Sequence, residues 1–213
     1  MLSLILNKMR YFNNTRKQIL RKVAKDDWQF LVPFLICTIS FIATDFFVFF
    51  DKADFAYWSG GLLEQPHRII SSHFIHFDAK HLLANTFGII FARYCLKALG
   101  LNGNYFFLLL VGLLIPSQTL FFWLSDIFLF RNPMSFAVGF SGIIYGVEAF
   151  ILLSSIFGKQ YFLSLNINLK KSLEIRQAMI LLIFIGMVYS LLPGISLLGH
   201  ITGIIAGSLI FLF

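Results

Sequence analysis

The sequence predicts an all-α membrane protein: a bundle of six transmembrane helices with both termini in the cytoplasm. Its mean hydropathy is +0.82, and 58% of its 213 residues are hydrophobic, which lies far outside the range of soluble proteins. Charged residues make up 13% of the chain and gather between the apolar runs. The net charge of +7 fits topology signals, and its distribution argues against a nucleic-acid partner.

Six stretches are long or apolar enough to cross a bilayer core, which takes about 20 helical residues. The last three are short, which indicates that their ends lie within the membrane thickness, against protein or water. With both termini cytoplasmic, 13 of the 17 lysines and arginines fall on the inner side, as the positive-inside rule requires. The six stretches are residues 28–50, 80–99, 105–124, 141–157, 178–192 and 195–213.

The chain divides into a short arm and one domain. Residues 1–27 form a basic cytoplasmic arm, expected to lie as an amphipathic helix on the membrane surface, and residues 28–213 form the six-helix membrane domain. The outer loop, residues 51–79, is rich in aromatic residues, which is typical of the membrane interface. Cys37 and Cys95 both lie in apolar runs and are expected to be small packing residues without a disulfide.

A turn of small residues, Gly139-Phe140-Ser141-Gly142, leads into the fourth helix. Gly139 and Gly142 leave bare backbone around the serine, so another chain can approach its hydroxyl closely. Taken alone, the tetrapeptide is more typical of a packing turn than of a reactive serine, because membrane helices use glycine and serine for close contact. Tyr145 follows Ser141 by four residues and is therefore expected on the same helix face, one turn deeper.

His200 in the sixth helix is followed by Gly203 and Gly207 on the same helix face. A face that lacks side chains can press against another helix. If it packs on the fourth helix, His200 meets Ser141 with Tyr145 beneath its ring. A serine hydroxyl is a poor nucleophile until a base takes its proton, and histidine is the usual base. The sequence places no carboxylate that would complete a triad, so the pair is expected to act as a dyad.

His81 and Asn85, at the start of the second helix, are spaced i and i+4 and share a face. In the predicted topology they lie at the outer side, at the depth of Ser141 and His200. Fixed hydrogen-bond donors converging at one depth are what an oxyanion hole requires. The backbone N–H of Ser141 is expected to be a further donor.

Together these motifs resemble the rhomboid family of intramembrane serine proteases. The family pattern places His-x-x-x-Asn, Gly-x-Ser-Gly and His-x-x-Gly-x-x-x-Gly in that order on alternate helices, and the chain carries all three from about residue 51 to its end. His76-Phe77 and Tyr145 also look like family positions.

The resemblance implies a role for each motif residue. Ser141 would be the nucleophile and His200 the general base and then the general acid. His81, Asn85 and the Ser141 amide would hold the oxyanion. The helix at 178–192 would act as a lateral gate, and residues 193–196 would form part of a cap.

The resemblance also implies the setting of the reaction. The substrate would be a single-pass or polytopic membrane protein, cleaved where one of its transmembrane helices unwinds near the outer end. The protein would sit among membrane lipids in the bacterial cytoplasmic (inner) membrane. It would use no cofactor, no metal and no nucleic acid.

Three positions depart from the expected pattern. His67-Arg68 stands where the family commonly has Trp-Arg, which puts the packing of the outer loop in question. Gly199 replaces a small residue such as alanine before His200. Glu148 lies seven residues after Ser141, about 10 Å deeper on the same face, and is interpreted as a neutral structural carboxyl or as part of a water path.

Three other interpretations stay open from the sequence. The serine, histidine and glycines could serve only in packing, as in non-catalytic relatives that bind membrane clients. A metal site on loop histidines is disfavoured because their spacing matches no zinc pattern; these are His67, His73, His76 and His81. A transporter would show inverted repeats and paired broken helices, which the sequence lacks.

Overall fold

The structure, a computed structural model, describes residues 27–47 and 50–213 and is mainly helical. The predicted arm, residues 1–27, lies outside the described residues except for Asp27. The long helices are Asp27–Phe46, α4 (Ala79–Ala98), α5 (Phe106–Leu124), α6 (Ser141–Phe157), α7 (Leu173–Tyr189) and α8 (Leu197–Ile210). Each of the six predicted stretches overlaps one of them, and α6 has the predicted bounds.

Within the described residues, two helices are both long and apolar enough to cross a membrane, judged by length and composition. They are Asp27–Phe46 and the helix Phe106–Leu129, which joins α5 to a π-helical turn, η1 (Ser125–Leu129). The helices Ser141–Phe157 and Leu197–Ile210 are apolar but shorter.

Side-chain caps mark where three of the long helices begin. Asp78 accepts a hydrogen bond from the His81 N–H at the start of α4, Ser172 caps α7, and Ser196 caps α8. A cap of this kind stabilises a helix by about 1 kcal/mol. The Ser172 cap explains why α7 begins at Leu173. The sequence predicted a start at residue 178 because the first turn of this helix is polar and carries no hydropathy signal.

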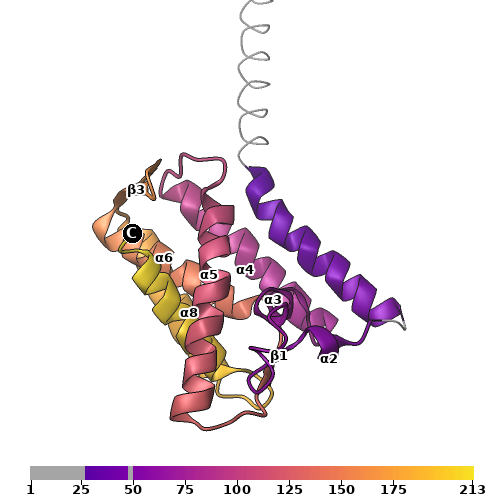
Figure 1. Ribbon diagram of the computed structural model, residues 1–213. Coiled ribbons are helices and arrows are strands. Elements are labelled where there is room, and N and C mark those ends of the chain that lie inside the picture. Colours follow the sequence, from indigo (N-terminus) through magenta and orange to yellow (C-terminus); the bar gives the residue numbers. More distant parts are fainter. Residues whose placement is uncertain (1–26, 48–49) are drawn as a thin grey trace, which may run out of the picture.

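Helix α6 lies at the centre of the fold, between α4, α5, α7 and α8. It is buried around most of its circumference, whereas the buried residues of α7 are only Ile175 and Met179. A helix that is apolar all round belongs inside a bundle. Figure 1 shows α6 and α8 on one side of α5, and α4 and the first helix on the other. Ser141 therefore stands at the end of the most enclosed helix.

The expectation of a purely α-helical chain was incomplete, because the described residues include two small antiparallel sheets. One pairs β1 (Tyr57–Trp58) with β2 (Phe136–Ala137), and the other pairs β3 (Lys159–Phe162) with β4 (Leu165–Leu169). The second is a hairpin after α6 in which Phe162, Ile167 and Leu169 are buried. Strands this short carry too few alternating residues to stand out from the apolar runs around them.

The β1–β2 sheet joins the outer loop to the segment just before Ser141. Tyr57 pairs with Ala137, and Trp58 pairs with Phe136. Two residues further on, the Gly139 N–H donates to the Ser72 carbonyl at 2.9 Å, which ties the serine turn to α3 (Arg68–Phe74). In Figure 1, β1, α3 and the short helix α2 (Lys52–Phe55) gather at the end of the helices opposite to β3.

Arg68 holds the outer loop together. It is buried and donates to the carbonyls of Ala53 and Ala56 and to the Gln65 side chain. The neighbouring His67, which replaces the expected tryptophan, contacts the Asp54 carbonyl at 3.1 Å. The loop is therefore packed through its arginine despite the missing tryptophan.

Candidate active site

The side chains of Ser141 and His200 meet at the junction of α6 and α8. The Ser141 Oγ lies 2.9 Å from His200 Nε2. Ser141 is the first residue of α6, and His200 lies in the first turn of α8, just after its Ser196 cap. The structure thus brings together the nucleophile and base candidates singled out by the motifs.

Close backbone packing between α6 and α8 produces this contact. A Cβ atom on Gly203 would collide with the Gly142 carbonyl, and one on Gly207 would collide with the Gly146 carbonyl. Gly142 is itself enclosed, because a Cβ there would lie 2.9 Å from the Gln118 amide nitrogen and 3.1 Å from the Gly199 carbonyl. Only glycine allows this approach, so the small-residue face of α8 has the packing role expected from its spacing.

The Tyr145 ring packs against the face of the His200 ring. Its ring stacks on the His200 ring with the centroids 4.2 Å apart and the planes 24° apart. Stacking on an aromatic face limits the rotation of the imidazole. Tyr145 therefore lies where its i+4 spacing from Ser141 predicts.

The second ring nitrogen of His200 also has a partner. Ser190, which follows the last residue of α7, places its Oγ 2.6 Å from His200 Nδ1. The same oxygen donates to the Gly186 carbonyl at 2.7 Å. Ser190 and His200 are both buried, with exposed fractions of 2% and 6%. The histidine is thus held at both nitrogens.

His81 and Asn85 face the serine turn from α4. Gly139 has φ +115°, a conformation that favours glycine, and a Cβ on it would collide with the His81 ring and lie 3.5 Å from Asn85 Nδ2. Both side chains therefore reach the backbone two residues before Ser141. Glycine is required at position 139 by its backbone angle and by this contact.

His76 fixes the direction of the Asn85 amide. Its Nδ1 donates to the Phe74 carbonyl at 3.1 Å, which leaves Nε2 to accept a hydrogen bond from Asn85 Nδ2 at 2.8 Å. Burial, with a smaller contribution from His81 nearby, lowers the pKa of His76 to about 4, so the ring is neutral at pH 7. The Asn85 amide nitrogen keeps its second hydrogen to donate elsewhere.

The backbone at Ser141 is favourable for an anion. Ser141 is the first residue of α6, so its N–H has no acceptor within the helix. The positive end of the helix dipole lies at the same point. A developing negative oxygen beside Ser141 would therefore be stabilised by α6 itself.

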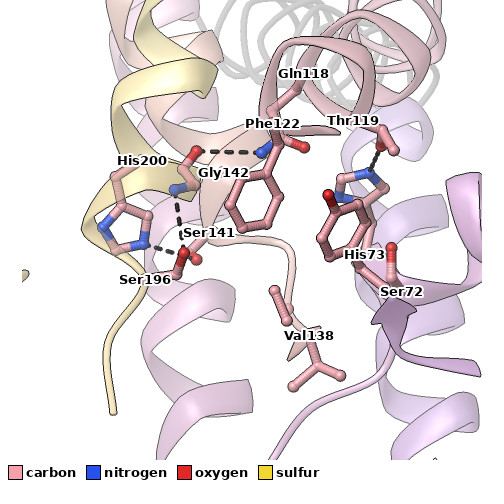
Figure 2. A pocket seen from close by; sticks show the side chains of 14 residues that line it. Ser72, His73, Gln118, Thr119, Phe122, Val138, Ser141, Gly142, Ser196 and His200 are labelled. Atoms are coloured by element: carbon pink, nitrogen blue, oxygen red, sulfur yellow. Dashed lines mark hydrogen bonds between the residues drawn. The ribbon is translucent and has the colours of Figure 1, made fainter. Parts of the chain in front are cut away.

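A small pocket opens beside Ser141 and His200, with a cavity volume of about 30 Å³. This is room for about two water molecules. Figure 2 shows His200 and Ser141 on one side, His73 and Thr119 on the other, and Phe122 between them. The lining is partly polar, and His73 Nε2 lies 2.8 Å from the Thr119 hydroxyl. Water can therefore be held next to the serine.

Comparison with known proteins identifies the fold. Residues 63–213 match the Rhomboid domain family, which is well over half of the chain. The chain belongs to the rhomboid family. No curated protein matches the sequence.

Membership makes this rhomboid an integral membrane protein of an intramembrane protease family that acts on membrane proteins. The matched segment runs from the outer loop through α8 and includes Ser141, His200, His81 and Asn85. The first helix and β1 lie outside it.

The remaining histidines of the rhomboid have separate partners. His67 contacts a carbonyl of the outer loop, His73 contacts Thr119, and His76 contacts Asn85. Across residues 27–47 and 50–213, no group of three or more histidine, cysteine, aspartate or glutamate side chains is arranged to hold a metal. Glu148 is buried in α6, with an exposed fraction of 6%.

Two residues of the site were missed as site residues by sequence reasoning. His76 stood out only as a family-like position, and its contact with Asn85 depends on the turn before α4, which spacing does not describe. Ser190 gave no signal, because it lies in a turn and shares no helix face with His200. Only the folded chain, which brings the residue after α7 to His200, makes it visible.

Proposed function

We propose that this rhomboid is an active serine endopeptidase that cleaves transmembrane segments of other membrane proteins. Ser141 is the nucleophile, and His200 is the general base and then the general acid. The 2.9 Å contact between Ser141 Oγ and His200 Nε2 carries the proposal. A serine and a base within hydrogen-bond reach are the elements of nucleophilic acyl transfer.

In the first step, Ser141 Oγ gives its proton to His200 Nε2 and attacks the carbonyl carbon of the scissile bond. The carbonyl oxygen becomes negative and accepts hydrogen bonds from the Ser141 N–H and from the side chains of His81 and Asn85. His200 then gives the proton to the leaving nitrogen, the C–N bond breaks, and an acyl-enzyme ester remains on Ser141.

In the second step, a water molecule attacks the ester. His200 takes one proton from the water, and the tetrahedral carbon collapses to a carboxylic acid as the proton returns to Ser141 Oγ. The pocket beside Ser141, with Gln118 and Ser196 among its lining residues, supports this step because it is large enough to hold water.

The helices and the charges support a proposed arrangement in the membrane. The six long helices cross the bilayer as one domain from residue 28, with both termini cytoplasmic, which is supported by 13 of 17 basic residues on the inner side. The helices α4, α6 and α8 then begin at the outer side, so the Ser141 site faces outward. The proposed location is the bacterial inner membrane, where the protein contacts lipid.

A substrate helix enters past α7, with residues 193–196 as part of the cap. Helix α7 is the least buried of the helices around α6, which supports this route. The substrate unwinds at its outer end, because a peptide bond within an intact helix is sterically shielded from attack. Single-pass and polytopic proteins both qualify.

The test uses the full chain in liposomes with a fluorescent transmembrane peptide. Ser141→Ala and His200→Ala are each expected to reduce cleavage by at least about a thousandfold. Ser154→Ala, a buried serine at the far end of α6, is the control and should cleave normally. Cleavage by the Ser141→Ala protein would refute the proposal.

Two further measurements address the open alternatives. A fluorophosphonate probe should label Ser141 in the wild type, whereas a client-binding protein without activity would neither label nor cleave. A strong chelator should leave cleavage unchanged, and loss of cleavage would instead support a metal site.

A further inference from the structure

The hydrogen-bond partners of His200 determine which ring nitrogen carries its proton. A neutral imidazole has one donor and one acceptor nitrogen. Nδ1 lies 2.6 Å from Ser190 Oγ, and Nε2 lies 2.9 Å from Ser141 Oγ. Because both contacts are with hydroxyl groups, which can donate or accept, these two distances alone leave both tautomers open.

The Gly186 carbonyl resolves this ambiguity. It lies 2.7 Å from Ser190 Oγ and can only accept, so the single proton of Ser190 is directed to it. Ser190 Oγ must then accept a hydrogen bond from His200 Nδ1–H. The lone pair of Nε2 is left facing Ser141, which is the form that can take its proton.

We infer that Ser190 is a positioning residue that holds His200 in its Nδ1–H tautomer and aims Nε2 at Ser141. The inference rests on the proposed function of the Ser141–His200 pair and adds a third group to it. In the opposite arrangement, Ser190 would donate to Nδ1. The Gly186 carbonyl would then keep only the Ser190 N–H as a donor, and its oxygen would lie 2.7 Å from Ser190 Oγ with no proton between them. Nε2–H would then point at Ser141, and no base would face the nucleophile.

Ser190 takes the place that a carboxylate holds in a triad, but it is neutral. It can orient the ring and set the tautomer, and it adds little stabilisation to the protonated ring compared with an aspartate. The titratable groups that face His200 from the other packed helices are Tyr145 of α6 and His81 of α4. Neither is a carboxyl group, so the Ser190 hydroxyl is left to select the tautomer.

Through Ser190, the proposed base His200 is linked to the end of α7. The other buried residues of this element, Ile175 and Met179, lie in its first half, so Ser190 is the buried attachment at its far end. Tyr145 adds to the same contact, because a Cβ on Gly186 would collide with its hydroxyl. The orientation of His200 therefore depends on the position of α7.

The test compares Ser190→Ala and Ser190→Thr with a matched control. The control is Ser154→Ala, because Ser154 Oγ also donates to the carbonyl four residues earlier, at 2.8 Å, but lies about 20 Å along α6 from Ser141. Ser190→Ala should lower kcat and the rate of fluorophosphonate labelling by about 10- to 100-fold, the effect of losing one buried hydrogen bond. KM should change less than twofold. Ser190→Thr, which keeps the hydroxyl, should recover most of both rates.

A spectroscopic measurement tests the tautomer directly. In the full chain labelled with ring-¹⁵N histidine, the His200 signals, assigned with His200→Gln, should show a protonated Nδ1 and an unprotonated Nε2 in the wild type. In Ser190→Ala the two forms should mix. This measurement needs no substrate, so it stays informative if the wild type neither cleaves nor labels, an outcome that would refute the proposed function alone.

Three results would overturn the inference. The first is a wild-type spectrum in which Nε2 carries the proton. The second is a Ser190→Ala protein that labels at the wild-type rate. The third is a Ser190→Thr protein that is as slow as Ser190→Ala while both fold like the wild type.

Discussion

His200 is confined on three sides by single residues. Ser141 contacts Nε2, Ser190 contacts Nδ1, and the Tyr145 ring lies against its face. Each contact restricts a different motion of the ring, so the imidazole has little freedom to turn away from the serine. The restriction comes from side chains on α6 and from the turn after α7, and not from α8 itself.

At this scale the contribution of the Tyr145 ring can be separated from that of its hydroxyl. Tyr145→Phe keeps the stacked ring and is expected to retain activity within about threefold, whereas Tyr145→Ala should lose about tenfold, since an aromatic pair contributes about 0.5–1.5 kcal/mol. The measurement is kcat/KM on the peptide in liposomes. Equal losses in the two variants would mean that the hydroxyl, and not the stacked ring, supports His200.

At the scale of the elements, the crossing of α6 and α8 sets the site. The contact is made by the backbones at Gly203 and Gly207, so it leaves no side-chain rotamer to adjust. This contact was accessible from the sequence, because the glycine spacing marks one face of α8. The bounds of α7 and the β3–β4 hairpin were not, because both depend on polar caps and short strands that hydropathy does not report.

Gly203→Ala tests this crossing. The added methyl group collides with the Gly142 carbonyl, and overpacking of this kind costs about 1–3 kcal/mol of stability. The thermal midpoint in detergent should fall, and cleavage should fall at least tenfold as Ser141 and His200 separate. Gly112→Ala on α5 is the control, because a Cβ there meets nothing within 4 Å. Equal behaviour of the two variants would contradict the backbone contact.

At the scale of the whole molecule, the outer loop and the helices form one structure. Arg68 joins parts of the loop, and the β1–β2 sheet joins the loop to the serine turn. The loop was expected at the membrane interface from its aromatic residues, yet Tyr57 is buried and stacks on Phe122 of α5 with the centroids 4.6 Å apart. Composition could not separate these cases, because an aromatic side chain serves equally at an interface and in a core.

The packing of the outer loop predicts a loss of stability in acid. Burial lowers the pKa of His73 to about 4 from its ordinary 6.5. Between these two pH values the unfolded chain binds a proton at His73 and the folded chain does not. Stability from this group is complete above pH 6.5 and is lost as the pH falls toward 4, by up to about 3 kcal/mol.

Thermal unfolding in detergent between pH 7.5 and 4 measures this loss. His73→Asn, which cannot be protonated, should show a flatter dependence than the wild type. Because carboxyl groups also take up protons in this interval, the difference between the two curves is the quantity to compare. Parallel curves would mean that His73 does not titrate on unfolding.

The pairing of β1 with β2 shows that the segment matching the family is shorter than the segment that supports Ser141. The segment shared with the rhomboid family starts at residue 63, whereas Tyr57 and Trp58, which brace the strand leading to Ser141, stand before it. A chain cut at that boundary would keep every group proposed to touch the substrate and lose the scaffold that aims one of them. The shortest piece of this protein expected to cleave a substrate is therefore longer than the segment that matches the family.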